Sequence, residues 1–240
     1  MNYNELNFDA MTRERELSMS AAFPVLMRKV YVWMTLALVI TGITAYGVAS
    51  SPGVISALYS NQAIMWGLII AEFALVIGIS AAINRLSLPT ATMLFVLYSA
   101  INGVMLSSVF LIYTASSIAS VFFITAGTFA VMAFIGYTTK TDLTSMGKII
   151  MMALIGLIIA SLVNVFLVKS SGFDLILSYV GVLIFVGPTA YDSQKIKQML
   201  LEAPDAGEGA QKLALLGALS LYLDFINLFI YLLRIFGKRE

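Results

Sequence analysis

The chain lacks two residue types that carry much of protein chemistry, cysteine and histidine. Without cysteine there are no disulfides, thiolate nucleophiles or sulfur-ligated metals, and without histidine neither a serine triad nor a histidine-ligated zinc site can be assembled. Charge is scarce too, because only 11% of residues are charged, against about 25% in an ordinary soluble domain. The net charge of +1 gives no electrostatic footprint for nucleic acid. We expect no nucleic-acid partner, no cofactor and no enzyme.

Long hydrophobic runs are what the sequence has instead, and hydrophobic residues make up 60% of it. About 20 apolar residues cross a hydrocarbon core about 30 Å thick. Runs of this kind cover residues 30–49, 64–83, 91–112, 118–137, 149–168, 175–191 and 213–233. Their patterning is helical, and lipid admits only helices or closed barrels. The sequence therefore predicts an all-α polytopic membrane protein, a bundle of seven transmembrane helices in a lipid bilayer.

The chain of 240 residues leaves no room for a soluble domain beside such a bundle. Residues 1–29 carry charges ahead of any long apolar run and lack the short basic start and early apolar core of a cleavable signal peptide. We interpret residues 1–29 as a cytoplasmic arm and residues 30–240 as a single transmembrane domain.

Basic residues predict the orientation of the helices, because they concentrate in short cytoplasmic loops. The arm and the second, fourth and sixth connections hold Arg13, Arg15, Arg28, Lys29, Arg85, Lys140, Lys148, Lys195, Lys197 and Lys212. The first and third connections hold none, and the fifth holds only Lys169, so we place the N-terminus in the cytoplasm. The C-terminal tail conflicts with this orientation, because a full crossing of the seventh segment would place Arg234, Lys238 and Arg239 outside the cytoplasm. That segment either spans, as its length favours, or re-enters and returns, as buried backbone permits.

Three acidic residues lie at membrane depth. Glu72 and Asp224 are central in their segments, and Asp192 lies near the end of the sixth. An ionisable group at a helix centre costs about 2.5–3.5 kcal/mol on insertion scales and usually faces a bundle interior or a watery cavity. Asp192 also has a plainer interpretation: if the membrane ends near Tyr191, it is a cytoplasmic helix residue beside Lys195.

The seventh segment carries a polar stripe, because its polar residues recur in steps of four and three and so share one helical face. The stripe consists of Ser220, Asp224, Asn227, Tyr231 and Arg234, and Gly217 extends it. The other faces are Leu, Ile and Phe, so the stripe should turn inward. Serine and asparagine commonly form hydrogen bonds between membrane helices. The aspartate is different, since an asparagine would supply hydrogen bonds without the cost of the charge.

Gly187 and Pro188 interrupt the sixth segment just before Asp192. They allow a kink or unwinding, as in helices that line ion sites, and we treat them as a candidate hinge. The stretch "YDSQKIKQML" that follows is compatible with helix, so the sixth helix can run on and bring Asp192 toward Asp224. Two carboxylates in low dielectric cannot both ionise cheaply, so such a pair titrates as a unit and can sense pH without histidine.

Three stretches of the sequence carry a family resemblance. "VYVWMTLALVITGITAY", "AYDSQKIKQM" and "ALSLYLDFINLFIYLLRIFGKR" resemble the Bax inhibitor-1 family, the transmembrane Bax-inhibitor-motif proteins, and lie in order across nearly the whole chain. The resemblance implies six helices around a central seventh, forming a pH-sensitive calcium leak. It implies that Asp192 and Asp224 are the pH sensor and that Glu72 is the acid of the second helix.

The resemblance also implies an arginine near the cytoplasmic end of the second helix that latches onto the aspartate pair in the closed state. This sequence departs from that pattern, because the position near the expected depth is Ile83 and the nearest base is Arg85. Whether Arg85 acts as the latch is open at this stage.

Calcium and protons are therefore the species that we expect this protein to move. Hard cations prefer oxygen ligands. Candidates for the site and its network are Asp192, Asp224, Glu72, Asn102, Asn227, Tyr191 and the carbonyls around the Gly-Pro break. The absence of cysteine, the short chain and the lack of a retrieval motif favour a bacterial inner membrane.

Two other functions stay open. The first is a membrane-embedded modulator of another protein, such as a quality-control protease or an apoptotic regulator. The second is an intramembrane aspartyl protease, in which one carboxylate acts as base and the other as acid. The stretch "LYLD" has leucine where those proteases carry glycines, and no Pro-Ala-Leu segment follows.

Overall fold

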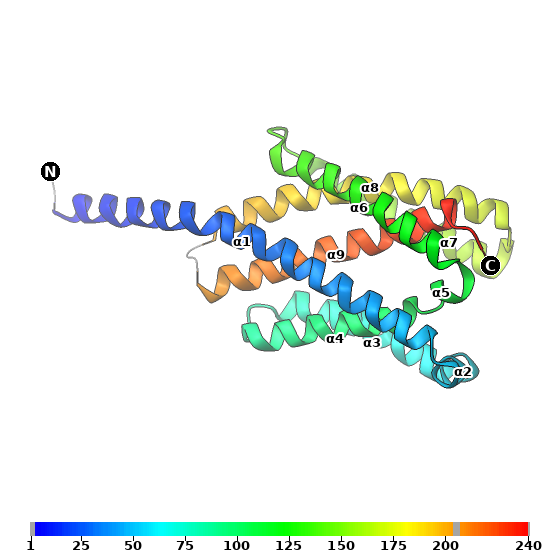
Figure 1. Cartoon of the computed structure of the whole chain (residues 1–240). Coiled ribbons are helices and arrows are strands. Elements are labelled where there is room, and N and C mark those ends of the chain that lie inside the picture. The colour runs from blue at the N-terminus through cyan, green and yellow to red at the C-terminus, as the bar shows by residue number, and fades with distance from the viewer. Residues whose placement is uncertain (1–2, 204–206, 240) are drawn as a thin grey trace.

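A computed structural model describes residues 3–203 and 207–239, and for residues 3–20 it describes the backbone only. Over these residues the chain is helical, apart from short connections and one bridge between Tyr113 and Arg239. In chain order the helices are α1 (Tyr3–Ala49), α2 (Pro52–Ser60), α3 (Gln62–Ala82), α4 (Leu88–Leu106), α5 (Val109–Ile112), α6 (Ala115–Thr138), α7 (Thr144–Val163), the π-helix η1 (Asn164–Val168), α8 (Ser171–Leu201) and α9 (Glu208–Phe236) (Figure 1).

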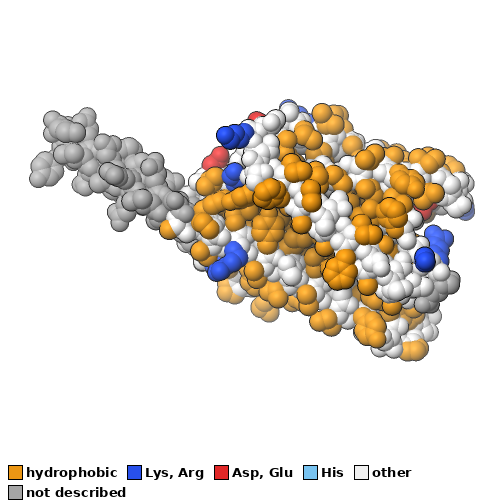
Figure 2. All heavy atoms as spheres, turned by 45° about the horizontal axis from the view of Figure 1, so that its top comes forward, with side chains coloured by type: hydrophobic (Ala, Val, Ile, Leu, Met, Phe, Trp, Pro, Cys, Tyr) orange, Lys and Arg blue, Asp and Glu red, His pale blue; other side chains and the backbone are white. Residues whose placement is uncertain are grey.

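Within the described residues, seven helical segments are long and apolar enough to cross a membrane, which confirms the predicted number. They are Ala21–Ala49, Gln62–Ala82, Leu88–Ile112, Ala115–Thr138, Thr144–Val168, Ser171–Leu201 and Glu208–Phe236. The first already includes residues 21–29, ahead of the predicted start at residue 30, and the sixth ends at residue 201 instead of 191. Figure 2 shows hydrophobic side chains over most of one face of the molecule, as a lipid-facing surface requires.

Prolines and capping side chains determine where several helices begin. Pro52 and Pro89 lie in the first turns of α2 and α4, where a missing backbone N–H leaves no helical hydrogen bond unmade. Ser87 and Ser170 cap α4 and α8, each accepting a hydrogen bond at 3.3 Å from the backbone N–H three residues ahead. These prolines and serines therefore account for the first residues of α2, α4 and α8.

The bundle has two ends, and more of the basic residues lie at one of them than at the other, which holds Lys169, Lys238 and Arg239. At one end, which we call the basic end, lie the α3–α4, α6–α7 and α8–α9 connections (Figure 1). These connections and the flanking helix turns carry Arg85, Lys140, Lys195, Lys197 and Lys212. At the opposite end, which we call the far end, lie α2, α5 and the C-terminus (Figure 1).

Helix α9 occupies the centre of the bundle, as the resemblance implied. In its most apolar stretch 67% of the residues are buried, against 6% in that of α3. The helix is continuous over 29 residues, and the segment after it reaches the far end, where the backbone N–H of Thr114 donates to the carbonyl of Lys238 at 3.1 Å. The structure therefore contains no re-entrant turn in the seventh segment, and the spanning alternative holds.

Helix α1 is continuous across the boundary that we drew at residue 29. From Ala21 onward the helix is long and apolar enough to cross a membrane, so its apolar part includes residues that we assigned to the arm. Residues 1–2 of the predicted arm lie outside the described residues. The division into an arm and a domain stays a prediction.

Candidate functional site

Helices α8 and α9 run antiparallel and pack closely along the polar stripe of α9. Two glycines make this approach possible. A Cβ on Gly217 of α9 would lie 3.0 Å from Ile196, and a Cβ on Gly181 of α8 would lie 2.6 Å from the ring of Tyr231. Small residues at helix interfaces let membrane helices approach each other. The stripe therefore faces α8, inside the bundle, as its pattern predicted.

This packing brings Asp192 of α8 together with two stripe residues of α9. The hydroxyl of Ser220 donates a short hydrogen bond to Oδ2 of Asp192. The carboxyl groups of Asp192 and Asp224 lie near enough to each other to interact electrostatically. The side chain of Asp224 is buried, and its Oδ2 atom has no hydrogen-bond partner among the described residues. The two aspartates thus form one cluster with Ser220, in which Asp224 is buried and Asp192 and Ser220 are half-buried.

Helix α8 continues for nine residues beyond Asp192, and hydrogen bonds hold this part to the end of α6 and to the α6–α7 connection. Gln194 is buried, accepts a hydrogen bond from the N–H of Leu143 at 2.8 Å and donates one to the carbonyl of Thr141 at 2.8 Å. Lys197 donates to the carbonyl of Tyr137 at 2.9 Å. These bonds tie α8 to the α6–α7 connection. Asp192 therefore faces α9 from within a long helix, and its position relative to the membrane edge stays a prediction.

A cavity of about 260 Å³ adjoins the aspartate cluster from the side of α3. Asp192, Ser220 and Lys195 contribute its polar wall, and the exposed Ser80 of α3 lies at its edge. Water occupies about 30 Å³ per molecule in the liquid, so this space accommodates several waters against Asp192. Asp192 therefore has a hydrated approach that Asp224 lacks.

On the far side of the aspartates the seam between α8 and α9 is closed. The rings of Phe185 and Tyr231 stack with their centroids 5.6 Å apart. Beyond them, Arg234 of the stripe forms an ion pair with Asp174 of α8 at 3.5 Å. Both charged groups are partly exposed, so the pair contributes little stability. Sequence reasoning missed Phe185 and Asp174, because each lies in an unremarkable position of an apolar run or a helix start.

The candidate hinge has no break in this structure. Helix α8 is continuous through Gly187 and Pro188, and Pro188 is buried within it. The unwinding that we considered is therefore absent, although the missing N–H of the proline still weakens the helix at this point. The role of the two residues as a hinge stays a prediction.

Three further candidates form no hydrogen bond or ion pair with the aspartates among the described residues. Tyr191 packs against Gly147 of α7, where a Cβ would be 2.8 Å from its hydroxyl. Asn227 donates to the carbonyl of Leu223 on its own helix at 2.8 Å. Arg85 is exposed just after α3, and its side chain forms no hydrogen bond or ion pair among the described residues. In this structure Arg85 is therefore not engaged as a latch.

Glu72 belongs to a second polar cluster, which joins four helices. The Nδ2 atom of Asn102 donates to Glu72 at 3.0 Å, and the hydroxyl of Tyr222 donates to Oδ1 of Asn102 at 3.1 Å. That hydroxyl also lies 2.7 Å from Oγ1 of Thr41, which donates to the carbonyl of Ser99 at 2.9 Å. Tyr222 is fully buried. Sequence reasoning missed it because it lies off the polar stripe, and a tyrosine in an apolar run carries no periodic signal.

The aspartate cluster is a poor cage for a resident cation. Calcium takes six to eight oxygen ligands, about 2.3–2.6 Å away. Within the described residues, no group of three or more acidic side chains comes together. Two carboxyls and one hydroxyl can share and exchange a proton, and they can attract a cation that keeps part of its hydration shell. The geometry thus fits a proton site or a transient ion contact.

Comparison with known proteins identifies the family of this chain. The family model described as "Inhibitor of apoptosis-promoting Bax1" matches residues 24–240. Inner membrane protein YbhL of Escherichia coli (strain K12) is 51% identical over 222 residues, which cover 92% of this chain and 94% of that protein. A protein of Borreliella burgdorferi is 48% identical over 214 residues, covering 89% and 92%. RP147 of Rickettsia prowazekii is 44% identical over 216 residues, covering 89% of each. The chain therefore belongs to the Bax inhibitor-1 family of multi-pass membrane proteins.

Proposed function

We propose that the protein is a calcium leak channel whose opening depends on the protonation of the Asp192–Asp224 pair. The observation that carries this proposal is the packing of α8 against α9, which joins Asp192 to Ser220 and brings it near enough to Asp224, one turn along α9, for the two carboxyl groups to interact. Two carboxyl groups stay close together only if a shared proton or a nearby positive charge offsets their repulsion. Arg85 forms no ion pair with the aspartates, and Lys195 acts on Asp192 only from beyond ion-pair distance, which favours a shared proton as the direct link between the two carboxyls.

The gate works through electrostatic repulsion. While a proton is shared, the carboxyls hold α8 and α9 together, with the help of the Ser220 hydroxyl. Loss of the proton at higher pH leaves two negative charges, which repel each other by about 4 kcal/mol at a separation of about 4 Å and an effective dielectric constant of about 20. Energies of this size shift a conformational equilibrium by orders of magnitude. The expected response is separation of the two helices and a rise in flux with pH.

The pathway begins at the basic end and is closed toward the far end. The cavity beside Asp192 and Ser80 would admit water and a hydrated cation to the first carboxylate. The stack of Phe185 and Tyr231 blocks the seam beyond. We assign the basic end to the cytoplasm, because loops rich in Lys and Arg remain on that side. Separation of α8 from α9 would part the two rings and open the seam.

Calcium flux into liposomes tests this function. We expect wild-type protein to give a flux that rises with pH, and Asp192→Asn and Asp224→Asn to give a flux without that pH dependence, because each removes one titratable carboxyl with little change in shape. Asp174→Asn is the matched control, since Asp174 also lies on α8 but pairs with Arg234 and not with Asp224. It should keep the wild-type pH profile.

Two results would contradict the proposal. One is a wild-type flux no greater than that of protein-free liposomes at every pH. The other is a pair of asparagine variants that both keep the wild-type pH dependence, which would place the sensor elsewhere.

A further inference from the structure

The polar cluster around Tyr222 contains more close contacts than its hydroxyl groups have hydrogens. Oγ1 of Thr41 lies 2.9 Å from the carbonyl oxygen of Ser99. The hydroxyl of Tyr222 lies 2.7 Å from Oγ1 of Thr41 and 3.1 Å from Oδ1 of Asn102. A hydroxyl has one hydrogen to donate, and carbonyl oxygens only accept. Two hydrogens cannot serve three contacts, so in this arrangement one pair of oxygens has no hydrogen between them.

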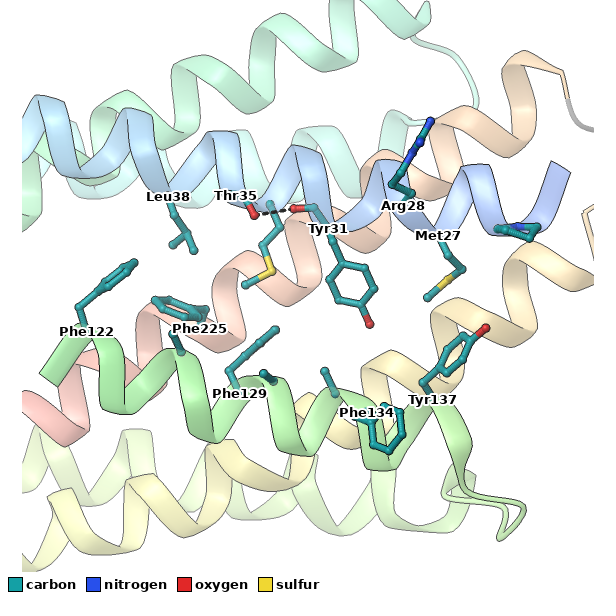
Figure 3. A pocket seen from close by; sticks show the side chains of 15 residues that line it. Met27, Arg28, Tyr31, Thr35, Leu38, Phe122, Phe129, Phe134, Tyr137 and Phe225 are labelled. Atoms are coloured by element: carbon teal, nitrogen blue, oxygen red, sulfur yellow. Dashed lines mark hydrogen bonds between the residues drawn. The ribbon is translucent and has the colours of Figure 1, made fainter. Parts of the chain in front are cut away.

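Water is a poor source of the missing hydrogen, because the cluster is buried and its surroundings are apolar. A cavity of about 320 Å³ lies beside Thr41, which supplies the only polar side chain among the described residues that line it. This cavity shares Leu38, Phe122 and Phe225 with a groove of about 700 Å³ between α1 and α6, and these three side chains lie together at one end of the groove (Figure 3). Apolar spaces of this kind stay dry.

A half-turn of the Asn102 amide removes the shortage. The oxygen and the nitrogen of an amide have nearly the same size, so the turn exchanges acceptor and donor while the heavy atoms keep their places. The Nδ2 atom then donates to the hydroxyl of Tyr222. That hydroxyl donates to Thr41, and Thr41 donates to the carbonyl of Ser99. Every contact in the chain now has one hydrogen.

The turned amide places its oxygen against Glu72. The amide of Asn102 lies 3.0 Å from Oε1 of Glu72, and a carboxylate oxygen, like an amide oxygen, only accepts. Two acceptors at this distance need a hydrogen between them, and a protonated Glu72 supplies it. A neutral carboxylic acid in an apolar site can donate a hydrogen bond in this way.

The surroundings of Glu72 also favour the neutral acid. The residue lies at the midpoint of α3, and the adjacent Phe73 is 67% exposed on the surface of this helix. The titratable side chains that interact with Glu72 are Tyr98 of α4 and Tyr222 of α9. Tyr98 also interacts with Asn102 and fits either orientation of the amide, because a hydroxyl both donates and accepts. Among the described residues no basic side chain pairs with Glu72, so an ionised carboxyl would bear the cost of a charge at membrane depth.

We propose that Glu72 is a second proton-binding site, which carries its proton at neutral pH and donates it to Asn102 at the head of a one-way chain of hydrogen bonds that ends on the carbonyl of Ser99. The site is separate from the aspartate pair, because Tyr222 and Asp224 are two residues apart on α9 and so point about 200° apart around its axis. Loss of the proton returns the chain to the arrangement with one hydrogen too few. Ionisation of Glu72 thereby loosens one of the contacts that join α1, α4 and α9. This role does not rest on a calcium leak.

Infrared spectroscopy of the purified protein tests the site, because a protonated carboxyl has a carbonyl band that an ionised carboxylate lacks. The background is the double variant Asp192→Asn and Asp224→Asn, which removes the other two acids at membrane depth. We expect this background to show the band at neutral pH and to lose it when Glu72→Gln is added. The band in the background is read without any change at residue 72, so the test stands even where Glu72→Gln alters the fold.

Thermal unfolding at several pH values gives an independent readout. Glu72→Gln keeps the shape of the side chain and a hydrogen-bond donor at every pH, whereas the wild type loses its donor when Glu72 ionises. The melting temperature of the wild type should therefore fall relative to that of Glu72→Gln as pH rises from neutral to alkaline. Glu202→Gln is the matched control, since Glu202 is exposed at the end of α8, and its offset from the wild type should stay constant.

A background without the carboxyl band at neutral pH would overturn the proposal, as would a band that Glu72→Gln leaves in place. A constant difference in melting temperature between the wild type and Glu72→Gln over this pH range would overturn it as well. Calcium flux plays no part in these measurements, so their outcome is independent of the proposed channel.

Discussion

Gly136 of α6 offers a sharp test of how the aspartate site is positioned. A Cβ at residue 136 would overlap the backbone of Ala190 on α8, two residues before Asp192, with the Cα of Ala190 only 2.7 Å away. Backbone cannot rotate aside as a flexible side chain can, so Gly136→Ala must push α6 and α8 apart. Overpacking of this kind costs about 1–3 kcal/mol, occasionally more.

Gly127, on the same helix, provides a reference substitution for the destabilisation caused by Gly136→Ala. A Cβ on Gly127 would have no neighbouring atom within 4 Å, so Gly127→Ala adds a methyl group in open space. Both substitutions gain helix propensity, worth up to about 1 kcal/mol. That gain cancels in the comparison, and the difference between the two variants should be about 1–3 kcal/mol. For a chain of this size, such a difference corresponds to a gap in melting temperature of about 2–12 °C.

Thermal unfolding in detergent measures this gap. Gly127→Ala should melt at or slightly above the wild-type temperature, and Gly136→Ala clearly below both. A melting temperature for Gly136→Ala equal to or above that of Gly127→Ala would refute the close contact between α6 and α8.

Two further substitutions test features outside the aspartate pair. Tyr222→Phe removes the hydroxyl that links Asn102 to Thr41, and because the site is buried we expect a loss of about 1–3 kcal/mol in unfolding free energy, measured by chemical denaturation. No loss would show that the polar cluster is not part of the stable core. Asp142, in the α6–α7 connection, accepts hydrogen bonds from the side chain and backbone of Thr144, and these lower the pKa of its carboxyl. A lowered pKa means that the ionised form stabilises the fold near neutral pH and that this stabilisation is lost as pH falls through the folded-state pKa. The melting temperature of Asp142→Ala should therefore lie below wild type at neutral pH and converge with it in acid; a pH-independent gap would contradict this.

The polar stripe shows how far sequence reasoning reached into the site. Periodicity placed Ser220, Asp224 and Tyr231 on one face of α9, and burial of that face followed from the cost of a charge in lipid. The residues of α8 that contact this face were harder to predict. Asp192 was a candidate because of its type, but Phe185 had no feature that separates it from the other apolar residues around it. A partner across a helix interface depends on the rotation and register of two helices, which a pattern in one helix does not specify.

Because a pattern in one helix does not specify its partners on another, the sequence also did not reveal the role of Gly136 or the polar cluster around Tyr222. Gly136 and Gly127 are alike in the sequence, nine residues apart on one helix, yet only Gly136 meets a neighbouring backbone. Tyr222 lies among leucines and was not expected to join Glu72 to Thr41. In each case the distinguishing property is a distance to another helix.

By itself the sequence determined that this protein is a membrane bundle of seven helices with an acid-bearing helix turned inward. Those conclusions depend on the transfer of residues between water and lipid, which is a property of each segment taken alone. Only the tertiary structure decided that Asp192 meets Ser220 and Asp224, that Arg85 stays unpaired in the described structure, and that α1 and α6 leave a groove between them. These depend on how ridges and small residues of different helices fit together, and that fit belongs to pairs of segments far apart in the chain.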